Sequence, residues 1–142
     1  MGNKTLCFPG VKVVDLSWML PTILAKHPSL QHLVVHIGAN DVYESEALRR
    51  NLTALLTTLK AKGPRIVVSG PIPTHGKGDM RWSRHFHLHG WFSRFCTANS
   101  LTYVDNFQLF TPHLPQLLRD GLHLVNEGTQ LLASNIGKAV DA

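Results

Sequence analysis

The sequence predicts an α/β fold of three layers, in which a parallel sheet lies between two layers of helices. Short β-branched segments alternate along the chain with longer segments whose apolar residues recur at helical spacing. Turn-forming residues follow the strand segments directly, as in sheets whose parallel strands are joined by helices. At 142 residues, with 44% hydrophobic and 16% charged residues, the chain has the size and composition of one globular domain, residues 1–142.

Four segments are expected to form strands, and the second is the most distinctive. It is a continuous apolar run that is closed by Gly38, which is typical of a strand buried on both faces of a parallel sheet. Each of the other segments is also apolar or β-branched, and two end at a Gly-Pro or Pro-Gly pair. The four strand segments are residues 5–8, 33–37, 65–69 and 101–104.

Four helices are expected between and after these strands. The first could be kinked or interrupted by Pro21. The second carries one apolar stripe of leucines and ends at Lys62-Gly63-Pro64, a late cation followed by a C-cap glycine and a helix breaker. The predicted helices are residues 11–26, a helix from Ser45 to that stop, 81–99 and 126–140. The leucine stripe is Leu48, Leu52, Leu55, Leu56 and Leu59.

The third predicted helix combines aromatic and basic residues. The net charge of +5 and the pI near 9.6 allow contact with a polyanion. Helical spacing favours a buried aromatic face that includes Trp82, Phe86 and Phe92, with Arg84 and Arg94 on the solvated face. The alternative is a surface that contacts nucleic acid or anionic lipid. Its basic residues would be Lys77, Arg81, Arg84 and Arg94.

Several classes of protein are disfavoured by what the sequence contains. Its apolar runs are shorter than the roughly 20 residues of a membrane-spanning helix, and its first ten residues lack the apolar core of a signal peptide. We therefore expect an intracellular, cytoplasmic protein. Cys7 and Cys96 form no disulfide framework, and we expect both to be buried as small apolar residues.

Three of the predicted turns hold residues that can carry chemistry. Asp120 and His123 precede the last helix, and at this spacing the carboxylate can hold the imidazole Nδ1–H and leave Nε2 as a general base. Asn40 follows the strand at 33–37, and Gly10 follows the first strand. A side-chain amide and a backbone N–H at these places can stabilise an oxyanion. Each pattern also has a purely structural alternative. Asp120 could be a helix N-cap beside a surface histidine, and the glycine and asparagine of the turn after residues 33–37 could serve the geometry of that turn alone.

Taken in order and spacing, these turns resemble the SGNH (or GDSL) serine hydrolases. The family has four sequence blocks, Gly-Asp-Ser, Gly, Gly-x-Asn-Asp and Asp-x-x-His. Residues of this chain that match the last three blocks are Gly10, then Gly38, Asn40 and Asp41, then Asp120 and His123. Within this family, the sequence around these blocks resembles the esterase domain in first-reading-frame proteins of fish non-LTR retrotransposons. This resemblance implies a flavodoxin-like sheet and hydrolysis of a small acyl ester or lipid by a Ser-His-Asp triad, with no metal or organic cofactor.

The first block of the family has no counterpart here. No Gly-Asp-Ser occurs in the sequence, and only nine residues precede Gly10. The resemblance therefore implies that the first, central strand and the nucleophile are missing. We expect an N-terminally truncated domain or a pseudoenzyme that is inactive as written. Ser69 is the single serine at a predicted strand end, and nothing around it marks a nucleophile turn.

Three further histidines, His36, His85 and His89, are candidate ligands or catalysts by residue type. His85 and His89 share a helix face, as zinc-binding pairs do, but no third ligand is evident in the sequence, so we expect structural or solvated roles. His36 lies in an apolar strand, which favours a core histidine with a satisfied hydrogen bond.

Overall fold

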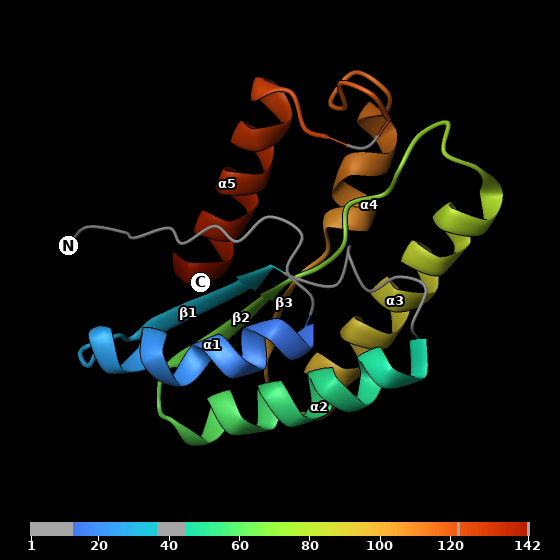
Figure 1. The fold of residues 1–142 in the computed structure, drawn as a ribbon. Helices are drawn as coiled ribbons and strands as arrows, with labels where there is room; N and C mark the ends of the chain where they lie inside the picture. The colour runs from blue at the N-terminus through green and yellow to red at the C-terminus, as the bar shows by residue number, and fades with distance from the viewer. Residues whose placement is uncertain (1–12, 37–44, 122, 142) are drawn as a thin grey trace.

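The computed structural model describes residues 13–36, 45–121 and 123–141, which form a parallel sheet with helices on both faces (Figure 1). The described strands are β1 (His32–His36), β2 (Arg65–Ser69) and β3 (Thr102–Val104), and they lie in the order β1-β2-β3. In this register Val35 is the partner of Val68, so the carboxyl ends of β1 and β2 meet at one edge of the sheet.

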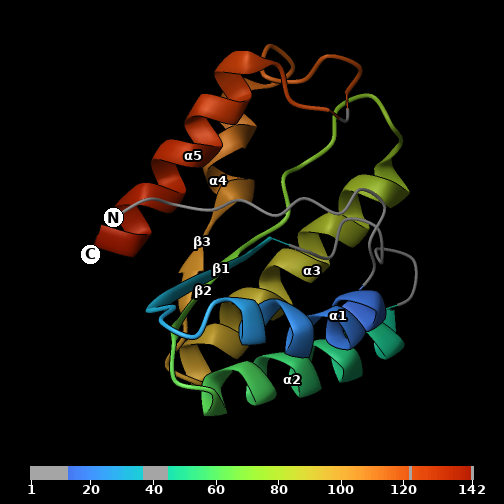
Figure 2. The same ribbon diagram turned by 60° about the vertical axis from the view of Figure 1, so that its left-hand side comes forward.

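Two layers of helices enclose the sheet, as the sequence predicts. Helices α1, α2 and α3 cover one face, and α5 covers the other (Figures 1 and 2). Helix α4 follows β3 directly and runs into a short 3-10 helix, η2. The bounds are α1 (Val13–Lys26), α2 (Ser45–Ala61), α3 (Asp79–Ala98), α4 (Asn106–Phe110), η2 (Thr111–His113) and α5 (Asn126–Asp141).

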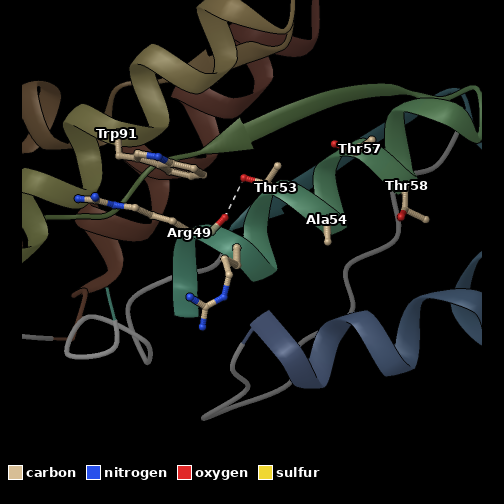
Figure 3. A pocket seen from close by; sticks show the side chains of 7 residues that line it. Arg49, Thr53, Ala54, Thr57, Thr58 and Trp91 are labelled. Carbon is tan, nitrogen blue, oxygen red and sulfur yellow. Dashed lines mark hydrogen bonds between the residues drawn. The ribbon is translucent and has the colours of Figure 1, made fainter. Parts of the chain in front are cut away.

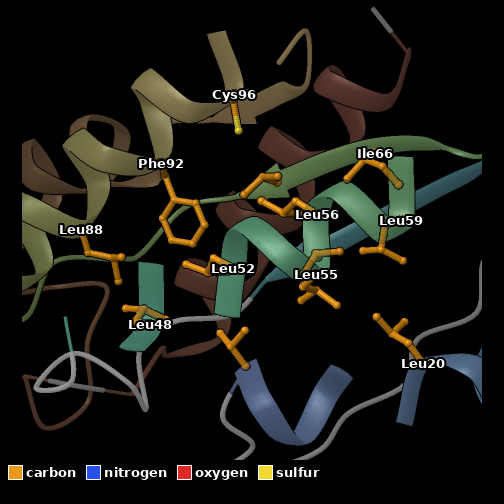
Figure 4. Close-up of a cluster of buried hydrophobic side chains, with 13 residues drawn as sticks. Leu20, Leu48, Leu52, Leu55, Leu56, Leu59, Ile66, Leu88, Phe92 and Cys96 are labelled. Atoms are coloured by element: carbon orange, nitrogen blue, oxygen red, sulfur yellow. The ribbon is translucent and has the colours of Figure 1, made fainter. Parts of the chain in front are cut away.

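The main core lies between the sheet and the layer of α1, α2 and α3 (Figure 4). The predicted leucine stripe of α2 faces inward, and Leu52 and Leu59 are fully buried. Phe92 of α3 packs into the same cluster, and Cys96 is a free, buried thiol whose pKa is raised by that burial to about 11. Each such leucine contributes about 1.5–3 kcal/mol of stability through burial, so α2 is a principal support of the fold.

Most predicted elements that lie within the described residues are confirmed to within two residues. Pro21 lies inside α1 without ending it. The predicted strand at 5–8 and Cys7 lie outside the described residues. Helices α4 and η2 were not predicted, because five-residue and three-residue helices are too short to show a periodic pattern.

The predicted face of α3 is wrong in part. Phe92 is fully buried, but Trp82 and Phe86 are 39% and 47% exposed. The buried residues of the helix are His85, Leu88, Phe92 and Cys96. Trp82 and Phe86 instead stack on each other with ring centroids 5.4 Å apart, and both contact Phe107 at the rim of the core.

None of the helices in the described ranges is long and apolar enough to cross a membrane.

Candidate active site

The structure brings Asp120 and His123 into direct contact. His123 Nδ1 lies 2.7 Å from Asp120 Oδ2, and the His123 backbone N–H donates to Asp120 Oδ1 at 2.8 Å. Both side chains are exposed, at 58% for His123 and 43% for Asp120. One carboxylate therefore holds both the ring and the backbone of the histidine and leaves the imidazole open to solvent.

The turn that carries this pair is closed by backbone hydrogen bonds. The Arg119 N–H donates to the His123 carbonyl at 2.7 Å, and an antiparallel bridge joins Leu118 to Leu124. Gly121 adopts a left-handed backbone with φ of 77°, which a residue with a side chain adopts only under strain. The turn thus begins and ends in fixed pairing, and this pairing sets the position of His123 just before α5.

A second contact holds this turn against the segment that leaves β2. The His75 N–H donates to the Gly121 carbonyl at 2.9 Å. A Cβ atom at Gly121 would overlap the His75 carbonyl oxygen, so the close approach depends on glycine. Through this contact, residues that follow the second strand support the turn that carries His123.

The chemistry available to the pair follows from its hydrogen bonding. An ionised carboxylate can only accept, so Nδ1 carries the proton that lies between the ring and Asp120. In neutral imidazole this leaves Nε2 with a free lone pair, which is the form that a general base needs. The contact expected from the Asp-x-x-His spacing is present, and its catalytic role remains a prediction.

The remaining predicted site residues are only partly placed. Gly10, Gly38, Asn40 and Asp41 lie outside the described residues, so the predicted oxyanion site remains a prediction. Of the basic residues, Lys77 and Arg94 are exposed, and Arg81 and Arg84 are half-buried.

Ser69, at the end of β2, is fully buried and lies within a network of hydrogen bonds. His36 Nδ1 lies 2.8 Å from Ser69 Oγ, and the side-chain amide of Asn106 donates to the same oxygen at 2.8 Å. A serine held in this way is poorly placed to reach a substrate. His36 has the satisfied hydrogen bond expected of it, but the residue is exposed, so its prediction as a core residue is wrong.

Asn106 lies at the carboxyl edge of the sheet and was not among the residues predicted from the sequence. It begins α4 directly after the β3 strand and donates to the Gly70 carbonyl at 2.8 Å. The signal was available, because polar residues that follow a parallel strand lie at the edge where ligands bind. The pair Asp105-Asn106 occupies such a position.

The histidines of α3 have structural contacts. His85 is buried and its Nδ1 bonds to the Arg81 carbonyl at 2.8 Å, while burial lowers its pKa. His89 Nδ1 lies 2.8 Å from the Tyr103 hydroxyl. Within the described ranges, no three His, Cys, Asp or Glu side chains gather in a way that could hold a metal ion.

A shallow groove of about 610 Å³ lies on the outer side of α2 (Figure 3). It is lined by Trp91 of α3 and by six residues of α2, among them Arg49 and Thr53. None of the predicted site residues lines it. Helix α2 lies on the face of the sheet opposite α5 (Figures 1 and 2), so a groove lined by α2 and Trp91 is separate from the Asp120–His123 turn that leads into α5.

Comparisons with known proteins agree with this fold. Residues 4–131 match the model of the GDSL-like Lipase/Acylhydrolase family. The esterase domain of the ZfL2-1 ORF1 protein from the zebrafish ZfL2-1 retrotransposon is 37% identical, with a TM-score of 0.64. The match covers 99% of this chain and 87% of that domain. No curated protein sequence matches the chain.

Two bacterial structures share the fold at lower sequence identity. A putative acylhydrolase from Bacteroides fragilis is 15% identical with a TM-score of 0.80, over 93% of this chain and 71% of that one. A catalytic mutant of an acetylxylan esterase from Geobacillus stearothermophilus is 18% identical with a TM-score of 0.77, over 92% and 68%. With a family match across most of its length and a 37% identical relative, this chain belongs to the GDSL-like lipase/acylhydrolase family.

Proposed function

We propose that this chain is an acyl-ester hydrolase domain of the Ser-His-Asp type, in which His123 is the general base and Asp120 orients it. The observation that carries the proposal is the 2.7 Å contact between His123 Nδ1 and Asp120 Oδ2, in an exposed turn just before α5. The carboxylate fixes the tautomer whose Nε2 can take a proton from a nucleophile, and it stabilises the imidazolium that forms. Gly10 and Asn40 are proposed as the oxyanion donors.

The nucleophile is the part of the triad that these 142 residues do not supply. They contain no Gly-Asp-Ser, and Ser69 is buried and hydrogen-bonded. We therefore expect the chain as written to hydrolyse esters slowly, because triad enzymes without their nucleophile keep only about 10³–10⁴-fold acceleration over water. The substrate class is a small acyl ester, including lipid esters, and similarity to the zebrafish esterase domain supports it.

The experiment compares this chain with a version that carries a family-type amino-terminal segment containing Gly-Asp-Ser. Turnover of a short p-nitrophenyl ester should be close to background for the chain alone and clear for the extended protein. In the extended protein, His123→Ala should lower kcat/KM at least about a thousandfold, and Asp120→Asn about a hundredfold or more.

The matched control is His113→Ala, which removes another exposed histidine from the nearby η2 helix and should leave turnover unchanged. Two results would count against the proposal. One is full activity of the extended protein after His123→Ala. The other is fast turnover by the 142-residue chain that is lost on Ser69→Ala, which would identify a different nucleophile.

A second candidate function is favoured by the exposed aromatic residues of α3. The rings of Trp82 and Phe86 stack with an angle of 10° between their planes, and Met80, earlier in the same helix, is 67% exposed. Exposed Lys77 lies just before the helix. Flat aromatic rings beside cations suit stacking with the bases of a single-stranded nucleic acid. Contact with anionic lipid is the other possibility for the same surface.

Fluorescence anisotropy of a labelled single-stranded RNA oligomer tests this candidate. Binding should weaken as salt rises from about 50 to 200 mM, because cation–phosphate contacts release counterions. Trp82→Ala should weaken it further, by about fivefold or more, through loss of stacking. Trp18→Ala is the matched control, because Trp18 is 81% exposed and belongs to α1 and not to α3. Binding to anionic vesicles with none to RNA would identify the surface as a lipid contact instead.

A further inference from the structure

A chain of hydrogen bonds runs along the carboxyl edge of the sheet, from α4 through β2 to β1. The side-chain nitrogen of Asn106 donates to the Gly70 carbonyl and to Ser69 Oγ, each at 2.8 Å. Ser69 Oγ in turn lies 2.8 Å from His36 Nδ1. Asn106 and Ser69 are both fully buried, whereas His36 at the end of β1 is exposed. The network therefore connects the interior to a histidine at the surface.

The protons of this network can be assigned from its partners. The Gly70 carbonyl can only accept, so the amide orientation of Asn106 is fixed, and its second N–H must point at Ser69. The Ser69 hydroxyl then has one acceptor among the described residues, which is His36 Nδ1. A buried hydroxyl proton without an acceptor destabilises the folded protein, because the desolvation of the hydroxyl is then uncompensated. Ser69 therefore donates to His36, and the remaining imidazole proton lies on Nε2.

Protonation of His36 is disfavoured by the same arrangement. A proton on Nδ1 would face Ser69 Oγ, and the serine proton would then lose the acceptor that Nδ1 provides. Burial lowers the pKa of His36, more strongly than a hydrogen bond with the Ser69 backbone raises it, although the residue retains exposed surface. The ring is thus kept neutral near neutral pH, with Nε2–H on the side of the ring away from Ser69.

We propose that His36 is a substrate-contacting residue, whose neutral Nε2–H donates to an oxygen of the bound acyl ester, and that Ser69 and Asn106 are its positioning residues. Its place in the fold supports this role. His36 is the last residue of β1, two residues before Gly38, at the sheet edge where ligands of such folds bind. An ester offers only acceptors, so a fixed donor that does not ionise suits it.

The role of His36 in binding an ester oxygen rests on the proposed ester hydrolysis. The assignment of its tautomer does not depend on that proposal. Long-range ¹H–¹⁵N spectra of the 142-residue chain at about pH 7.5 report the tautomer of each histidine. His36 should show a proton on Nε2 and none on Nδ1. Ser69→Ala should release this preference, and Ser93→Ala, on α3, should leave it unchanged. A proton on Nδ1 of His36, or an unchanged spectrum in Ser69→Ala, would overturn the assignment.

Ligand contact is tested in the same spectra with acetate, a product of acetyl-ester hydrolysis. Acetate should shift the His36 Nε2 signal saturably at concentrations that leave His113 unmoved. In the Gly-Asp-Ser-bearing protein, His36→Phe should lower kcat/KM about tenfold, the effect of one lost hydrogen bond, while His36→Gln, which keeps an N–H donor, should recover part of it.

The two proposals fail in different ways. If the extended protein turns over ester, but His36→Phe has no effect and acetate leaves His36 unmoved, the role of His36 is wrong and the proposed function stands. If no ester is turned over, but acetate shifts His36, the proposed function is wrong and the donor site stands.

Discussion

Gly121 is the residue on which the geometry of the Asp120–His123 turn most depends. It combines a left-handed backbone with a close approach to the His75 carbonyl oxygen, which leaves no room for a Cβ atom at position 121. The sequence identified Asp120 and His123 as a pair, because the interaction is local and set by spacing. It could not show that His75, from another part of the chain, holds the turn in place.

Gly121→Ala should therefore destabilise the protein and displace His123. We expect the free energy of unfolding in urea to fall by about 1–3 kcal/mol, because the new Cβ is strained and overlaps a backbone oxygen. Gly137→Ala is the matched control. Gly137 lies inside α5 with open space around it, so alanine should stabilise the protein by up to about 1 kcal/mol. Equal effects of the two substitutions would contradict this account of the turn.

At the scale of the elements, α3 shows where periodicity fails as a guide to burial. The pattern correctly placed Phe92 inside but placed Trp82 and Phe86 with it. Those two rings rest on Phe107 of α4, a tertiary contact at the rim that leaves part of each ring in solvent. The buried face contains His85 instead, whose Nδ1–H is satisfied by the Arg81 carbonyl one turn earlier. A polar residue with a local partner can replace an apolar one in the core.

Burial of His85 should make the stability of the fold depend on pH. Its pKa is lowered by burial in the folded state and is about 6.5 in the unfolded chain. Below about pH 6.5 the unfolded chain takes up a proton that the folded protein resists. The free energy of unfolding should therefore be highest above pH 6.5 and fall as pH drops toward the lowered pKa, by up to about 1.4 kcal/mol per pH unit.

Urea unfolding between about pH 7.5 and 5 measures this dependence. His85→Gln should flatten part of the slope. His36, whose pKa is also lowered by burial, should contribute to the part that remains. His87→Gln, at an exposed position of α3, should retain the slope of the parent chain. A parental slope in His85→Gln would show that His85 takes no part in this effect.

At the scale of the whole molecule, the alternation of strands and helices was enough to predict the parallel sheet and its two helical layers. The described strands pair in sequence order from β1 to β3, as consecutive strands of a sheet commonly do. The network of His36, Ser69 and Asn106 could not be predicted, because it depends on the register that sets His36 beside Ser69. Pairing between strands is a long-range property that no local pattern contains.

We expect residues far apart in the sequence to form one ester-hydrolysing site at the carboxyl edge of the sheet. A crystal structure of the 142-residue chain that places Gly10, Asn40 and His123 would test this arrangement. We expect the Gly10 N–H, the Asn40 side-chain amide and His123 Nε2 to point into one space beside the ends of β1 and β2. A structure with Asn40 and His123 at opposite ends of the domain would contradict the account.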